Sequence, residues 1–119
     1  MAKAALVIHD DSGLRKLLRV RLENDGVQVL EAGDRRLAME IYKTHPGQIG
    51  VVVSGVRMKG VDVGTLLDDF RKADPSVPFF LFTSHAPDLD LAKTQAIRVF
   101  GKPEGLNDLL QSVREVLSV

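Results

Sequence analysis

The sequence predicts an α/β protein in which five parallel strands form one sheet that helices cover on both faces. Short apolar runs alternate along the chain with amphipathic helical patterns, and the short connections imply right-handed crossovers between parallel strands. The β-branched run Val51-Val52-Val53 lies between Gly50 and Gly55, which is typical of a central strand buried on both faces. Neither a repeat nor a linker interrupts the pattern, so we expect a single domain over residues 1–119.

The composition argues against several classes of function. Sixteen basic and sixteen acidic residues cancel, so no overall charge draws the chain to nucleic acid or to an anionic membrane. The chain has no cysteine, which excludes disulfides, thiol catalysis and thiolate metal sites and agrees with a reducing compartment. The apolar residues before His9 are too few for a signal peptide or a membrane span. We therefore expect a cytoplasmic protein.

The first half of the chain is expected to contain two strands and two helices before the central strand. Ala4–Ile8 is an apolar run too short for a helix of ordinary length, and the second strand is predicted at Val27–Leu30. Asp11 or Ser12 can cap the first helix, and Asp34 can cap the second. The apolar positions at helical spacing are Leu14, Leu17, Leu18 and Leu22 in the first helix, and Leu37, Ala38, Ile41 and Tyr42 in the second.

The second half predicts two further strands, at Phe79–Phe82 and Ile97–Phe100. A third helix precedes them and stops before residues 74–78, where two prolines interrupt the chain. Between the two strands, His85–Thr94 has room for about two helical turns. A closing helix over Leu106–Leu117 shows the clearest amphipathic pattern of the chain.

Polar residues follow four of the predicted strands, at carboxyl ends that meet along one edge of a parallel sheet. These segments are His9-Asp10-Asp11, Ser54-Gly55, Thr83-Ser84 and Lys102-Pro103. An acidic pair after the first strand, a hydroxyl after the fourth and a Lys-Pro after the fifth, in a chain of this length, strongly resemble the receiver domain of two-component response regulators. The resemblance covers the whole chain.

The resemblance implies a flavodoxin-like (βα)5 fold with strand order 2-1-3-4-5. In receivers an aspartate that ends the third strand accepts a phosphoryl group from a histidine kinase, and two acids after the first strand help it to hold Mg²⁺. A hydroxyl after the fourth strand and a lysine after the fifth bind the phosphoryl group. The resemblance matches Asp10 to the second acid, Thr83 to the switch hydroxyl and Lys102 to the lysine.

Two of the pocket carboxylates of the family are missing. Gly55 stands at the acceptor position, and His9 stands where the first acid is expected. Lys59 also replaces the proline that is usual in the loop after the third strand. Asp10 remains the one candidate ligand for Mg²⁺, and a single carboxylate rarely holds this ion well. We therefore expect the ordinary phosphorylation chemistry to be lost.

Two further departures concern the coupling and the partner surface of the family. Val99 stands where many receivers carry the aromatic partner of the switch hydroxyl. The stretch from Thr83 to Lys102 is a few residues short, which shrinks the fourth helix.

Structural roles compete with functional ones at these positions. Asp11 can simply cap the first helix. Strand alternation points Ser54 away from position 55, so we expect a packed, hydrogen-bonded hydroxyl. His9 is expected to fill and partly neutralise the pocket, and we hypothesise that Lys102 pairs with Asp10.

We interpret the chain as a degenerate receiver, or pseudo-receiver: a regulatory interaction module and not an enzyme. Its expected partners are a protein partner, an output domain or a histidine kinase, with a homodimer through helix 4, strand 5 and helix 5. No resident cofactor is expected, and at most weak Mg²⁺ binding at Asp10. One alternative is a receiver phosphorylated on Asp10 or Asp11. Another is a small hydrolase or nucleotide-binding enzyme, although the chain has no Gly-rich phosphate loop and no nucleophile–base pair.

Overall fold

The structure is a computed structural model that describes residues 3–83, 98–101 and 105–118. Lys102 and the segment His85–Thr94, where a short helix is expected, lie outside the described residues. The described elements are β1 (Ala4–Ile8), α1 (Ser12–Asn24), β2 (Val29–Ala32), α2 (Arg35–Thr44), β3 (Ile49–Gly55), α3 (Val63–Ala73), β4 (Phe79–Thr83), β5 (Arg98–Gly101) and α5 (Leu106–Leu117).

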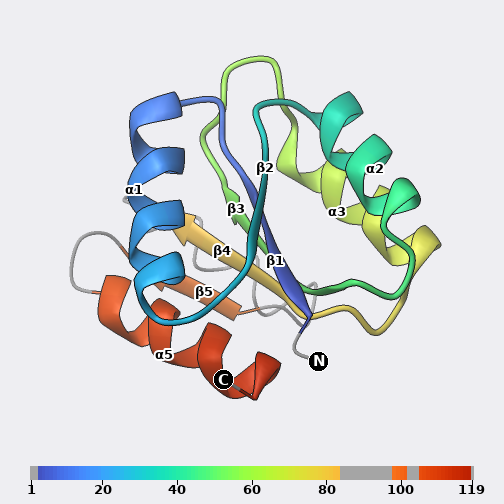
Figure 1. The fold of residues 1–119 in the computed structure, drawn as a ribbon. Helices are drawn as coiled ribbons and strands as arrows, with labels where there is room; N and C mark the ends of the chain where they lie inside the picture. Colours follow the sequence, from blue (N-terminus) through green and yellow to red (C-terminus); the bar gives the residue numbers. More distant parts are fainter. Residues whose placement is uncertain (1–2, 84–97, 102–104, 119) are drawn as a thin grey trace.

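The five strands form one parallel sheet in the order β2-β1-β3-β4-β5, with β3 at its centre (Figure 1). This confirms the predicted fold class and strand order. In the register, Ile8 at the end of β1 pairs with Ser54 of β3, and Gly55 pairs with Phe82 of β4. The carboxyl ends of three neighbouring strands therefore stand at the same level.

Helices cover both faces of the sheet, with α1 and α5 on one face and α2 and α3 on the other (Figure 1). Alternation along β1 divides its side chains between two separate cores. Leu6 and Ile8 belong to the core beneath α2 and α3, whereas Ala5 and Val7 belong to the core beneath α1 and α5. All five residues of β1 are buried, as a strand covered on both faces requires.

Aspartates begin three of the helices, as N-caps. Asp11 accepts hydrogen bonds from the backbone N–H groups of Gly13 and Leu14, at 2.9 and 3.1 Å. Asp34 accepts one from Leu37 at 2.8 Å, and Asp62 accepts one from Gly64 at 3.2 Å. Each bond satisfies a donor that the first turn of a helix leaves without an intrahelical partner.

The prediction for the second strand is wrong by two residues, because the strand is Val29–Ala32 and not Val27–Leu30. The N–H of Val27 donates to Leu22 at 3.0 Å, so this valine still closes the end of α1. Gly26 makes that turn with φ of +85°. The sheet ladder starts only where Val29 pairs with Ala5.

The central strand is longer than predicted and begins at Ile49, so that Gly50 lies within it. A β-carbon at position 50 would lie 2.5 Å from Cδ2 of Leu117 and 2.9 Å from Cβ of Lys3. The strand therefore carries a glycine here because α5 and the start of the chain press against its backbone.

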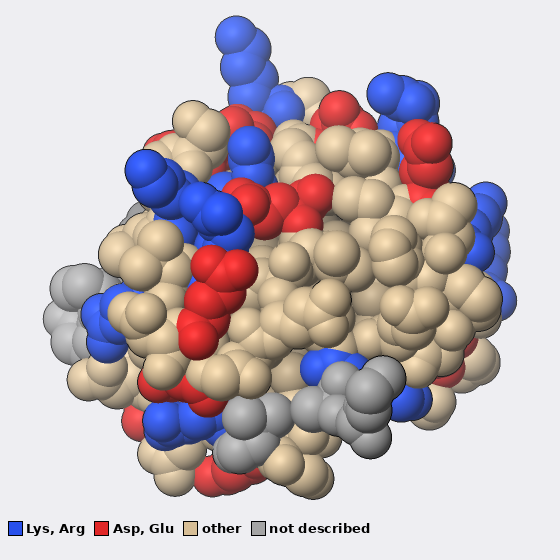
Figure 2. Space-filling view, viewed as in Figure 1, with Lys and Arg blue, Asp and Glu red and all other residues tan. Residues whose placement is uncertain are grey.

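Charges of both signs are spread over the surface. Figure 2 shows basic and acidic side chains next to one another on the face that it draws, with a broad uncharged area between them. Among the described residues, no helix is long and apolar enough to cross a membrane.

Candidate functional site

The sheet brings most of the predicted site residues to one edge. We call His9, Asp10, Asp11, Gly55 and Thr83 the strand-end cluster, because they lie at or just after the carboxyl ends of β1, β3 and β4. Lys102, the fourth part of the predicted site, lies outside the described residues.

The imidazole of His9 occupies the space in which a side chain at position 55 would begin. A β-carbon built on Gly55 would lie 2.5 Å from Cδ2 and 2.6 Å from Nε2 of His9. Real β-carbons do not approach other atoms so closely. His9 is only 6% exposed, so its ring is packed inside the protein. No residue larger than glycine fits at position 55 while this ring stays where it is.

Interactions with Arg15 and Asp11 help to hold His9 in this position. Arg15 donates from Nη1 to the carbonyl oxygen of His9 at 2.7 Å, and its Nε donates to Glu31 of β2 at 3.2 Å. The N–H of Asp11 donates to Nδ1 of His9 at 3.0 Å, which requires this nitrogen to be unprotonated. The same Nδ1 lies 3.1 Å from Oδ1 of Asp10.

Asp10 accepts a hydrogen bond from the loop after β3. The backbone N–H of Lys59 donates to Oδ2 of Asp10 at 2.7 Å. This bond lowers the pKa of the Asp10 carboxyl despite the opposing effect of burial. The side chain of Asp10 is 30% exposed, so the bond forms at the edge of solvent.

A tight turn presents this N–H. The N–H of Val61 donates to the carbonyl of Met58 at 3.3 Å, and Gly60 has φ of +73°. These features are typical of a type II turn with Lys59 and Gly60 at its centre. Proline is favoured at the position of Lys59 in such turns, but a proline there would have no hydrogen to give to Asp10.

The hydroxyl groups of the site are buried. Ser54 is 1% exposed, and its Oγ donates to the carbonyl oxygen of Gly55 at 2.7 Å. Thr83 is 3% exposed at the end of β4. Val99 is half-buried in β5 and packs against the core beneath α2 and α3.

The donor set does not suit a divalent metal ion. Among the residues that the structure describes, no group of three His, Cys, Asp or Glu side chains could hold one. Asp10 offers one carboxylate to the strand-end cluster, and one of its oxygens accepts from Lys59. Asp11 uses Oδ1 for the cap of α1. Mg²⁺ requires nearly octahedral oxygen coordination, which one partly occupied carboxylate does not provide.

Two contributors to this site were not predicted from the sequence. The N–H of Lys59 could have been noticed, because a lysine in place of a proline restores a backbone donor. Arg15 gave no such signal, since its place on the outside of the first helix predicts only a solvated side chain.

The chain resembles known proteins in sequence and in fold. A model of the response regulator receiver domain family matches residues 5–114. The chain is 39% identical over 120 residues to the C4-dicarboxylate transport transcriptional regulatory protein DctD of Pseudomonas aeruginosa, with 96% of this chain and 25% of that protein covered. It is 32% identical to the sensor kinase CckA of Brucella abortus, with 94% of this chain and 12% of that protein covered. The chain thus spans about a quarter or less of these relatives.

Solved structures give the same assignment. A response regulator receiver domain protein from Clostridium thermocellum superposes with a TM-score of 0.86 at 26% identity, and the match covers 98% of this chain and 94% of that one. The chemotaxis protein CheY4 of Vibrio cholerae shares the fold, with a TM-score of 0.84 at 20% identity and coverage of 98% and 100%.

Proposed function

The chain belongs to the response regulator receiver domain family of two-component signalling, and we propose that it regulates a protein partner without accepting a phosphoryl group at its strand-end cluster. In this proposal the chain is a pseudo-receiver. Its regulation comes from binding and not from aspartyl phosphorylation.

The observation that carries the proposal is the place of the His9 ring. The acceptor position holds a glycine, and the imidazole fills the space that an acceptor side chain would need. The site is therefore not an intact pocket that lacks one carboxylate. The imidazole of His9 fills the interior of the site, and the bond from Arg15 to the carbonyl oxygen of His9 helps to hold this residue in place.

The remaining acids support the proposal because each already has a structural task. Asp11 caps α1, and Asp10 accepts the N–H of Lys59. Phosphorylation of either would place a dianionic group where the carboxylate now accepts a backbone hydrogen. Ser54 is buried and donates its hydroxyl hydrogen to a carbonyl, so it is poorly placed to act as an acceptor.

The finer features of the proposal follow from the family. Receiver domains interact with histidine kinases and output domains, and relatives of this chain are a sensor kinase and transcriptional regulators. We propose that this domain works in the cytoplasm, has no enzymatic activity of its own and requires no metal. Self-association through helix 4, β5 and α5 remains part of the proposal, although the expected helix 4 lies outside the described residues.

The test compares the native chain with two variants in the presence of Mg²⁺ and beryllofluoride, which mimics a phosphoryl group. Backbone amide shifts are followed by NMR. We expect no response from the native chain and a small one from Gly55→Asp, because His9 obstructs the new side chain. The double variant Gly55→Asp/His9→Asp should respond at the strand-end cluster, including Thr83. His9→Asp alone serves as the matched control and should remain silent.

Shifts in the native chain that need Mg²⁺, centre on Asp10 and disappear in Asp10→Asn would contradict the proposal. That result would favour phosphorylation on the remaining acids.

A further inference from the structure

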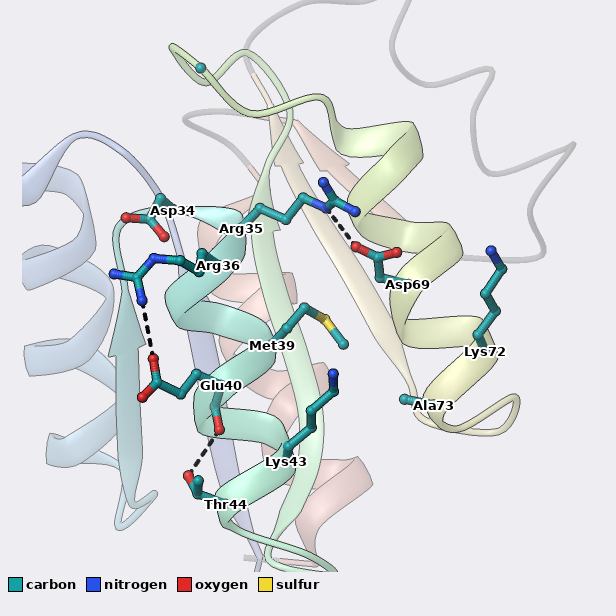
Figure 3. A pocket seen from close by; sticks show the side chains of 11 residues that line it. Asp34, Arg35, Arg36, Met39, Glu40, Lys43, Thr44, Asp69, Lys72 and Ala73 are labelled. Carbon is teal, nitrogen blue, oxygen red and sulfur yellow. Dashed lines mark hydrogen bonds and ion pairs between the residues drawn. The ribbon is translucent and has the colours of Figure 1, made fainter.

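A large groove lies between α2 and α3. Its volume is about 1140 Å³, and residues of both helices line it together with Gly60 (Figure 3). No member of the strand-end cluster is among the lining residues. A groove larger than the usual ~300–1,000 Å³ of small-molecule sites, and formed along two helices, suits a segment of another protein better than a small molecule.

An ion pair closes one end of this α2–α3 groove. Nε of Arg35 on α2 donates to Oδ2 of Asp69 on α3, across the space between the helices (Figure 3). Asp69 is only 22% exposed, and the bond from Arg35 lowers the pKa of its carboxyl. The single carboxylate that α3 contributes to the lining is therefore already paired.

Two lysines lie beyond this pair without an ion pair of their own in the described chain. Lys43 belongs to α2 and Lys72 to α3, so they stand on facing walls (Figure 3). Both are exposed, and both help to lower the pKa of the Asp69 carboxyl, which places them within its electrostatic reach. Three cations thus surround this one carboxylate and leave an excess of two positive charges around it, in a chain whose net charge is zero.

The floor between these charges is apolar. Met39 is half-buried and points from α2 toward α3 (Figure 3), and it packs against the core beneath the two helices. A methionine adapts its shape to different apolar partners. At the rim, Arg36 pairs with Glu40, and the hydroxyl of Thr44 donates to the Glu40 carbonyl, so these groups add no net charge and no unused donor. Asp34, the remaining acid of the lining, caps α2 and keeps its negative charge, so the whole lining carries one net positive charge.

We propose that the α2–α3 groove binds an acidic amphipathic helix of a partner protein. One apolar stripe of that helix would lie on Met39, and its flanking carboxylates would meet Lys43 and Lys72. The helices α2 and α3 have 10 and 11 residues, so at about 1.5 Å per residue the groove accepts roughly three turns of a partner helix. This inference goes beyond the proposed function, because it does not depend on whether position 55 can accept a phosphoryl group.

The experiment uses a synthetic 18-residue helix with a leucine stripe flanked by glutamates, and a control helix with lysines in place of the glutamates. The peptides are titrated into the native chain while backbone amides and the Met39 methyl group are followed by NMR. We expect saturable shifts confined to α2 and α3 with the acidic helix, weaker binding at high salt, and no binding of the basic helix.

Two double variants, which change the net charge of the chain by the same amount, test the site. Lys43→Glu/Lys72→Glu should weaken binding at least tenfold, whereas Lys16→Glu/Arg21→Glu on α1 should leave it within about twofold. The proposal is overturned if the acidic helix fails to saturate, if its shifts centre elsewhere, or if both double variants weaken it equally. Equally tight binding of a single-stranded oligonucleotide would also overturn it, because the groove would then recognise charge alone.

Discussion

Replacing Lys59 by proline should remove the hydrogen bond to Asp10 while keeping the turn that presents it. Proline has no backbone hydrogen, and it is favoured at this position of a type II turn. Lys59→Ala is the matched control, because it removes the lysine side chain and keeps the N–H. The two variants separate the backbone donor from the charge.

The expected energies follow from the geometry. A hydrogen bond to a charged acceptor contributes about 1.5–3 kcal/mol when it is protected from water. The side chain of Asp10 is 30% exposed, so water competes, and we expect about 1 kcal/mol. The proline itself should stabilise the turn by about 0.4–1 kcal/mol, because it restricts the unfolded chain. Lys59→Pro alone should therefore change the free energy of unfolding very little.

A double-mutant cycle separates the contribution of the hydrogen bond from the opposing effect of the proline. In an Asp10→Ala background, Lys59→Pro should show only the stabilising effect of the proline, so the coupling between positions 10 and 59 should be about 1 kcal/mol. Urea denaturation measures all four proteins. Since the folded state lowers the pKa of Asp10, the coupling should be complete above about pH 4 and decline as the pH falls through the folded-state pKa. A coupling near zero at pH 7 would refute the assignment of this bond.

Three other perturbations test the remaining features. Asp11→Ala should cost about 1 kcal/mol in urea denaturation, whereas Ser12→Ala should cost less than about 0.5 kcal/mol, since Asp11 makes the cap bonds. Burial and the bond to Asp74 raise the pKa of Tyr42 to about 12, so this contribution to stability should be present below about pH 10 and disappear between pH 10 and 12. Absorbance titration should give a lower midpoint in Asp74→Ala than in the native chain, and an unchanged midpoint would mean that the hydroxyl is not bound to Asp74. Gly55→Ala should cost about 1–3 kcal/mol in the native background and clearly less in His9→Ala, and equal costs would mean that the ring is not in the way.

Local patterns in the sequence predicted the parts of the structure that depend on near neighbours. The apolar run Ala4–Ile8 and the cap at Asp34 needed only the residues beside them. The start of β2 was missed because Val27 is apolar in either role, and only its bond to Leu22 assigns it to the end of α1. The two valines at positions 27 and 29 cannot be distinguished by pattern alone.

The order of the strand ends predicted that His9, Gly55 and Thr83 would lie at one edge of the sheet, but it did not predict their contacts. That the ring of His9 lies over Gly55 depends on the register of β1 against β3 and on a side-chain rotamer, which no local pattern contains. The bond from Lys59 depends in the same way on the shape of a turn 49 residues away along the chain.

Because His9 packs over Gly55, the order in which positions 9 and 55 are substituted matters. An aspartate introduced at position 55 first meets the imidazole, whereas a smaller residue introduced at position 9 first opens the space and strains nothing at Gly55. The effect of each substitution therefore depends on the residue at the other position. An aspartate at position 55 is tolerated better when position 9 changes first than when position 55 changes first. In a library that varies one position at a time, Gly55→Asp should be less stable than the native chain, and a library that varies both should recover this substitution together with a changed residue at position 9.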